Sequence, residues 1–210
     1  MTETAPVSAQ SSTADSVERR VGTVGRVHPH LEIKIVDENG KVVPRGKLGE
    51  LCVRGYSVML GYWEDNDKTQ EVIDVAKWMH TGDIAEMDEE GFVKIKGRIK
   101  DVVIRGGENL FPKEIEDFLY THPDVSDVQV IGLPDPRYGE ELCACIILHE
   151  HHQINEEAIR QYCAEHISHN KVPRYVRFFT EFPMTASGKA QKFKLQELMR
   201  QELNLLEDIA

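Results

Sequence analysis

The chain has 210 residues, 40% of them hydrophobic and 29% charged, and a formal net charge of −11. This composition is typical of a globular protein with enough apolar content for a core. The acidic balance argues against a nucleic-acid or anionic-membrane binder, and no apolar run approaches membrane-spanning length.

Residues 1–20 are polar, and they lack the basic start and apolar core of a signal peptide. We expect a flexible polar loop there. Residues 21–96 are β-rich, because the segments LEIKIV, GELCVRG and AEMDEEGFVKIKG show strand patterns. Asn39-Gly40 and Glu90-Gly91 predict hairpin turns, and NDKTQEVIDVAKWM predicts a short helix. This part of the chain predicts a small β-barrel-like subdomain.

From residue 97 the pattern changes to strands interleaved with helices. Helical spacing appears in FPKEIEDFLYTHP, INEEAIRQYCAEHI and FKLQELMRQEL, with Pro112 in the first turn of the first helix and Asn155 capping the second. Strands are predicted in VSDVQVIGLP, ELCACIILH and RYVRFFTEF. Residues 97–210 therefore predict a compact α/β domain of about three strands and three helices, and the overall fold class is α+β.

The four cysteines have no CxxC spacing, and Cys143 and Cys145 lie in a predicted buried strand. They indicate reduced core thiols and a reducing compartment such as the cytoplasm. The tract HEHH at 149–152 lacks the HExxH zinc spacing and predicts a solvated loop.

Positive charge gathers in two places despite the acidic balance. The basic residues of these two groups are Lys94, Lys96, Arg98, Lys100 and Arg105, and then Lys189, Lys192 and Lys194. Such groups indicate a localised anionic ligand, although solvated faces explain them as well.

Three motifs have residues suited to chemistry, each with a plainer alternative. In WMHTGD, the Asp83 carboxylate could accept two hydrogen bonds from a vicinal diol, or Gly82-Asp83 could merely form a turn. In GRIKDVVIRGGENLFPKEIE, Arg98 offers a planar fork for ribose or phosphate oxygens, and Gly106-Gly107 allows close backbone approach to a ligand. The alternative is a connector with a helix entry turn.

The third motif, PMTASGKAQKFK, places Lys189 behind the small residues Ser187 and Gly188. A pliable loop could deliver its ammonium group to an anionic reaction centre. A solvated surface loop is the alternative.

Taken in order, these motifs and GELCVRGYSVMLGYW resemble the C-terminal part of the adenylate-forming superfamily, which includes acyl-CoA synthetases, firefly luciferase and peptide-synthetase adenylation domains. MTET resembles the end of the family's Tyr-Gly-x-Thr-Glu motif. RGGEN and ISHNKVPRYV look most like medium-chain fatty acyl-CoA synthetases. The resemblance implies that residues 21–96 end the large AMP-binding domain and that residues 97–210 are its small mobile C-terminal domain.

The resemblance also implies roles in binding ATP or AMP. Thr2 would contact the α-phosphate, and Glu3 would help to hold Mg²⁺. Asp83 and Arg98 would bind the ribose hydroxyls.

Three further roles belong to the movement between two half-reactions. Lys189 would bridge the carboxylate substrate and the α-phosphate during adenylation. Lys100 would be the hinge between the domains, and Gly107 would line the path of CoA.

The implied reaction is that of a fatty acid–CoA ligase. ATP and a fatty acid give acyl-adenylate and pyrophosphate, and the CoA thiol then displaces AMP. The family's Ser/Thr/Gly-rich phosphate loop is not found in this sequence. We therefore expect a C-terminal fragment that is inactive alone, with the N-terminal AMP-binding portion as its missing partner. It would act in the cytoplasm, or in the mitochondrial matrix if the source is eukaryotic.

Two alternatives stay open. The chain could belong to a ligase that activates aryl or amino acids. It could also be a non-catalytic, truncated nucleotide-binding or interaction module.

Overall fold

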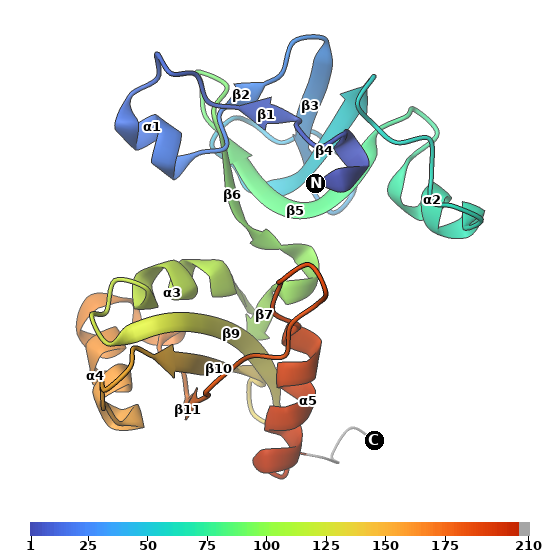
Figure 1. Ribbon diagram of the computed structural model, residues 1–210. Helices are drawn as coiled ribbons and strands as arrows, with labels where there is room; N and C mark the ends of the chain where they lie inside the picture. The colour runs from blue at the N-terminus through green and yellow to red at the C-terminus, as the bar shows by residue number, and fades with distance from the viewer. Residues whose placement is uncertain (206–210) are drawn as a thin grey trace. The chain divides into compact units, whose positions relative to one another are not determined.

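The computed structural model describes residues 1–205. The chain forms two compact units, and the first ends at Lys100 and the second begins at Asp101. Each unit has its own sheet (Figure 1). Each also has its own buried core. The expected boundary near Gly97 lies inside a strand, β6, which ends at Arg98.

Unit 1, residues 1–100, is built on a four-stranded antiparallel sheet in the order β3-β4-β5-β6 (Figure 1). The bounds of these strands are Leu31–Val36, Gly49–Gly55, Met79–Met87 and Val93–Arg98. The predicted strands and the hairpin at Glu90-Gly91 are therefore confirmed. The buried core on this sheet consists of Ile35, Leu51, Val53, Ala85, Met87 and Val93.

The sheet of unit 1 is open. Among the described residues, β3 and β6 are its two edges, so the expected barrel-like closure is not found. Period-two alternation predicts which face of a strand is buried, but it carries no information on whether the edge strands meet.

Residues 1–20, expected to be a loop, contain several short elements. These are the 3₁₀ helix η1, Thr2–Thr4, the strand β1, Ala9–Gln10, and most of the helix α1, Val17–Gly22. β1 pairs with β2, Arg26–Val27, in a separate two-stranded sheet. Elements this short show no periodicity that a sequence analysis could detect. The other helix of unit 1 is α2, Asn66–Val72, capped by Asp65.

Unit 2 is a five-stranded sheet with helices on both faces. Its strands are β7, Val103–Arg105; β8, Glu108–Leu110; β9, Val125–Asp135; β10, Gly139–Leu148; and β11, Tyr175–Phe178. Its α-helices are α3, Pro112–Leu119; α4, Glu156–His166; and α5, Lys192–Glu202. β10 pairs antiparallel with β9 and parallel with β11.

Alternation along β10 explains why helices cover both faces of the sheet. Leu142, Ala144 and Ile146 face the core formed with α3 and α4, whereas Cys143 and Cys145 face the core formed with α5. All four cysteines of the chain are buried and free, as expected of core thiols. Asn155 caps α4 as predicted, because its side chain accepts the Ala158 N–H at 2.9 Å.

Three strands were expected in unit 2, and the two further strands are β7 and β8, each three residues long. They form a hairpin whose turn is Gly106-Gly107, with φ of +59° and +86°. Two successive positive φ values suit the twist of a two-residue hairpin, and glycine adopts them without strain. Two shorter 3₁₀ helices are η2, Ile99–Asp101, and η3, His169–Lys171. In the part of the chain that the structure describes, no helix has the length and apolar character to cross a membrane.

Candidate functional site

Asp83 lies within the strand β5, in a bulge. The ladder with β4 pairs Glu50 with Ile84 and Cys52 with His80, so one residue of β4 faces three residues of β5, 81–83. Gly82 in the middle has φ of +70°, which a glycine adopts most readily. Bulges of this kind change the direction in which a side chain points.

Asp83 and Arg98 are brought together by the next pair of strands. They are directly paired across β5 and β6, and Arg98 Nε lies 3.4 Å from Asp83 Oδ1. The Arg98 side chain is 50% exposed and that of Asp83 23% exposed, so solvent reaches the pair. The carboxylate accepts hydrogen bonds and the guanidinium donates them, which makes the pair suitable for a diol.

The N-terminal turn contains Thr2, which is exposed, and Glu3, which is half-buried. The Tyr62 hydroxyl donates to Glu3 Oε1 at 3.2 Å, and the Met59 N–H donates to the Glu3 carbonyl at 2.8 Å. Burial and the negative charge of Glu3 raise the pKa of Tyr62. These contacts anchor Glu3 to the segment between β4 and α2.

Glu3 was expected to help hold Mg²⁺. Among residues 1–205, it belongs to no group of three metal-ligating side chains.

Lys100 is exposed and lies in η2, and it is the last residue of unit 1. Gly107 lies in the β7–β8 turn, where an added Cβ would meet no atom within 4 Å. Glycine is therefore favoured at this position by its positive φ. The surrounding atoms would leave room for a larger residue.

The loop that carries Lys189, expected to be pliable, is closed by its own hydrogen bonds. The Thr185 N–H donates to the Lys189 carbonyl at 2.8 Å, and the Lys189 N–H donates to Thr185 Oγ1 at 3.0 Å. Gly188 supplies the positive φ of the turn, +77°. Lys189 itself is exposed.

Each of the two basic groups contains side chains that are paired with carboxylates. Lys192 Nζ lies 2.6 Å from Glu116 Oε1, and Lys96 Nζ lies 3.0 Å from Glu86 Oε1. Arg105 Nη2 donates to the buried Glu141 at 3.0 Å. Half of the eight basic residues pair with carboxylates of their own unit, namely Lys96, Arg98, Arg105 and Lys192. The other four, Lys94, Lys100, Lys189 and Lys194, are exposed.

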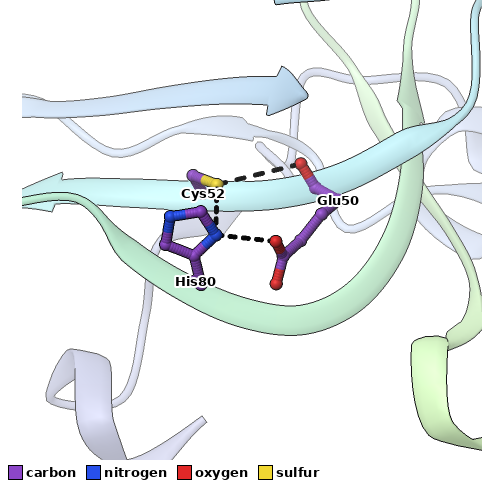
Figure 2. A group of neighbouring side chains, drawn as sticks. All are labelled: Glu50, Cys52 and His80. Carbon is purple, nitrogen blue, oxygen red and sulfur yellow. Dashed lines mark hydrogen bonds and ion pairs between the residues drawn. The ribbon is translucent and has the colours of Figure 1, made fainter. Parts of the chain in front are cut away.

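The sequence analysis missed one cluster, formed by Glu50, Cys52 and His80 beside the bulge (Figure 2). His80 Nδ1 lies 2.7 Å from Glu50 Oε2 and 3.6 Å from Cys52 Sγ. All three residues stand in motifs noted in the sequence, Glu50 and Cys52 in GELCVRG and His80 in WMHTGD, but nothing in their spacing indicated contact.

The geometry of this cluster is that of a hydrogen-bonded network. Tetrahedral zinc would separate a nitrogen and an oxygen ligand by about 3.3 Å, well above the observed 2.7 Å between His80 and Glu50. Burial and the charge of Glu50 raise the pKa of Cys52 to about 12, so the thiol is protonated in this network. The tract HEHH belongs to no group of three metal-ligating side chains within residues 1–205.

Both units match one family of enzymes. Residues 1–63 match the profile of the AMP-binding enzymes, and residues 114–189 match that of the AMP-binding enzyme C-terminal domain. The chain belongs to the AMP-binding enzyme family. It corresponds to the C-terminal portion of these adenylate-forming enzymes.

The relatives include acyl-CoA ligases. The chain is 55% identical over 205 residues to the mitochondrial medium-chain acyl-CoA ligase ACSF2 of Bos taurus, covering 97% of this chain and 33% of that protein. It is 50% identical over 205 residues to the putative acyl-CoA synthetase YngI of Bacillus subtilis, covering 97% of this chain and 37% of that protein. The chain thus spans about a third of the length of these relatives.

Among solved structures, ATP-bound MatB from Rhodopseudomonas palustris matches with a TM-score of 0.88 and 34% identity. The match covers 96% of this chain and 40% of that one.

Proposed function

We propose that this AMP-binding family chain supplies the C-terminal part of an AMP-forming fatty acyl-CoA ligase. The overall reaction converts ATP, a fatty acid and CoA to acyl-CoA, AMP and pyrophosphate through an acyl-adenylate. The observation that carries this proposal is the solvent-accessible pair of Asp83 and Arg98 in a chain 55% identical to a medium-chain acyl-CoA ligase.

In this proposal the two residues of the pair bind the ribose of ATP. The Asp83 carboxylate accepts hydrogen bonds from the 2′- and 3′-hydroxyls, and the Arg98 guanidinium donates to the ribose oxygens. Thr2 contacts the α-phosphate. Mg²⁺ would neutralise phosphate charge, with Glu3 among its ligands.

Lys189 acts in the first half-reaction. The carboxylate of the fatty acid attacks the α-phosphorus, and negative charge builds on the phosphoryl oxygens as pyrophosphate leaves. The exposed ammonium of Lys189 is suited to offset that charge, and the backbone of Lys189 is held by hydrogen bonds to Thr185.

The second half-reaction would follow a rotation of residues 97–210, the mobile domain, relative to residues 21–96, the end of the large domain. Lys100 is proposed as the hinge, and it lies where the two compact units meet. Gly107 would then border the path of CoA, where a turn without side chains leaves room. One active site could thereby suit two transition states in turn.

The free, buried cysteines fit a reducing compartment. The cytoplasm is the proposed location, or the mitochondrial matrix for a eukaryotic source, and the mammalian relative ACSF2 is named as mitochondrial.

A fusion would test the proposal. The part of the Bacillus subtilis relative that precedes its matched region is joined to this chain, and pyrophosphate release is measured with a medium-chain fatty acid. Thioester formation is measured separately, from synthetic acyl-adenylate and CoA.

We expect Lys189→Ala to slow pyrophosphate release by at least about 100-fold, the usual cost of losing one group that stabilises transition-state charge. Thioester formation should keep its rate. Lys194→Ala, which removes another exposed lysine nearby in the sequence, should leave both steps intact. Equal loss of both half-reactions in Lys189→Ala would overturn the assigned role.

A further inference from the structure

The bulge that carries Asp83 leaves backbone groups without partners in the ladder. Leu51 is the one residue of β4 that faces residues 81–83 of β5, so regular pairing cannot satisfy all of their N–H groups. Side chains supply the missing acceptors. The Asp83 N–H donates to Thr81 Oγ1 at 3.1 Å, and the Thr81 hydroxyl donates to the Leu51 carbonyl at 2.8 Å.

Glu50 satisfies the central residue of the bulge. Its Oε1 accepts the Gly82 N–H at 3.0 Å, so a carboxylate of β4 holds the residue directly before Asp83. The other oxygen, Oε2, lies 2.7 Å from His80 Nδ1, which fixes the carboxylate in this orientation (Figure 2). The Glu50 side chain is only 19% exposed, so water competes weakly for these bonds.

His80 is in turn held from two other sides. Cys52 Sγ lies 3.6 Å from Nδ1, and Asp74 Oδ2 lies 3.9 Å from Nε2. These contacts, from β4 and from the segment before β5, favour the orientation of the imidazole that meets Glu50. A chain of contacts therefore runs from His80 through Glu50 and Gly82 to Asp83.

We infer that Glu50 is a positioning residue for the ribose site: it fixes the Gly82 bulge and thereby aims the Asp83 carboxylate at the ribose hydroxyls beside Arg98. Glu50 acts through the backbone and does not touch the nucleotide. The inference rests on the proposed function, because it presumes that Asp83 binds ribose.

The test uses the whole 210-residue chain, labelled with ¹⁵N, and follows backbone amide signals by NMR as nucleotide is added. Two probes are compared, AMP and 2′,3′-dideoxyadenosine monophosphate, which lacks both ribose hydroxyls. Three variants accompany the unchanged chain: Glu50→Ala, Glu50→Gln and Glu32→Ala. Glu32 is the matched control, since it is a carboxylate of the same sheet that lies on β3, which is not a neighbour of β5, and it pairs with Arg54 at 2.8 Å.

Glu50→Ala should raise the dissociation constant for AMP about tenfold, in line with the loss of one hydrogen bond to a charged group. Binding of the dideoxy nucleotide should stay unchanged, because only the ribose hydroxyls use Asp83. Glu50→Gln keeps an oxygen for the Gly82 N–H and should restore most of the affinity for AMP. Glu32→Ala should bind both nucleotides like the unchanged chain.

Two results would overturn only the positioning role. One is equal AMP affinity in Glu50→Ala and the unchanged chain, and the other is the same loss for both nucleotides, which would indicate general disruption of the sheet. If the unchanged chain does not bind AMP more tightly than the dideoxy nucleotide, the proposed ribose site itself fails, and the inference fails with it.

Discussion

The ion pair between Lys192 and Glu116 joins three elements of unit 2. Lys192 Nζ, at the start of α5, lies 2.6 Å from Glu116 Oε1 on α3 and 3.1 Å from the Val130 carbonyl on β9. The same Glu116 oxygen accepts the Val130 N–H at 2.8 Å. The two charged side chains are only 21% and 14% exposed.

Lys192→Met keeps the apolar length of the side chain and removes its charge. An exposed ion pair contributes roughly 0–1 kcal/mol to the free energy of unfolding, whereas removing one partner of a buried pair lowers that free energy by roughly 3–5 kcal/mol. Because this pair is mostly buried but Glu116 keeps the Val130 N–H, we expect a loss of about 2 kcal/mol in the free energy of unfolding. For a domain the size of unit 2, that corresponds to a fall in Tm of about 8 °C.

The assay can use the placement of the tryptophans. The chain has two, Trp63 and Trp78, and both lie in unit 1. Thermal unfolding followed by far-UV circular dichroism reports on both units, whereas tryptophan fluorescence reports on unit 1. The Lys192→Met variant should therefore shift a transition in the dichroism and leave the fluorescence transition in place.

Lys113→Met provides the control, because Lys113 pairs with Asp117 at 2.8 Å on the surface of α3, with side chains 48% and 59% exposed. It should cost less than about 0.5 kcal/mol. Equal shifts in the Lys192 and Lys113 variants would refute the reasoning, as would a fluorescence transition that moves as far as the dichroism.

Two other predictions concern the hinge and the response to acid. In the fusion ligase, Lys100→Pro should preserve pyrophosphate release and slow thioester formation; a normal rate of CoA transfer would exclude the hinge role. Burial opposes ionisation of Asp135, but the N–H groups of Tyr138 and Arg137 and the charge of Arg174 outweigh it and lower the pKa of this carboxyl. The ionised Asp135 carboxylate therefore stabilises the fold fully above about pH 4, the pKa of this carboxyl in the unfolded chain. This stabilisation is lost as the pH falls through the lower pKa of the folded state. Asp135→Asn should lower the midpoint of urea unfolding at pH 7. The midpoint of this variant should also fall less steeply than that of the unchanged chain as the pH drops below about 4. An equally steep fall in the two proteins would contradict the prediction.

The longer elements of the fold could be predicted from the sequence because their side chains repeat with a clear period. β3, β4 and β10 were each expected, and so were the cap at Asn155 and the buried thiols. β7 and β8 were missed because three residues are too few to show alternation. Whether the sheet of unit 1 closes depends on how its edges lie in space, which a period does not encode.

The candidate site could be predicted only in part. Asp83 and Arg98 come from different motifs and were joined only by the family resemblance, and the register of β5 and β6 places them side by side. Glu50 was missed because its contact with Gly82 depends on a bulge, and the sequence around these two residues does not indicate a bulge. Within the two basic groups, Lys96, Arg105 and Lys192 pair with carboxylates that do not adjoin them in the sequence, so these pairs also depend on the fold.

The self-closed loop around Lys189 has an entropic consequence. Fixing the backbone of one residue costs roughly 1–2 kcal/mol, and here that cost is met during folding, through the bonds between Thr185 and Lys189. A loop that had to become ordered around each new substrate would lose that free energy from binding in every turnover. With its backbone preorganised, the loop leaves only the methylene chain of Lys189 to be immobilised when an anion arrives.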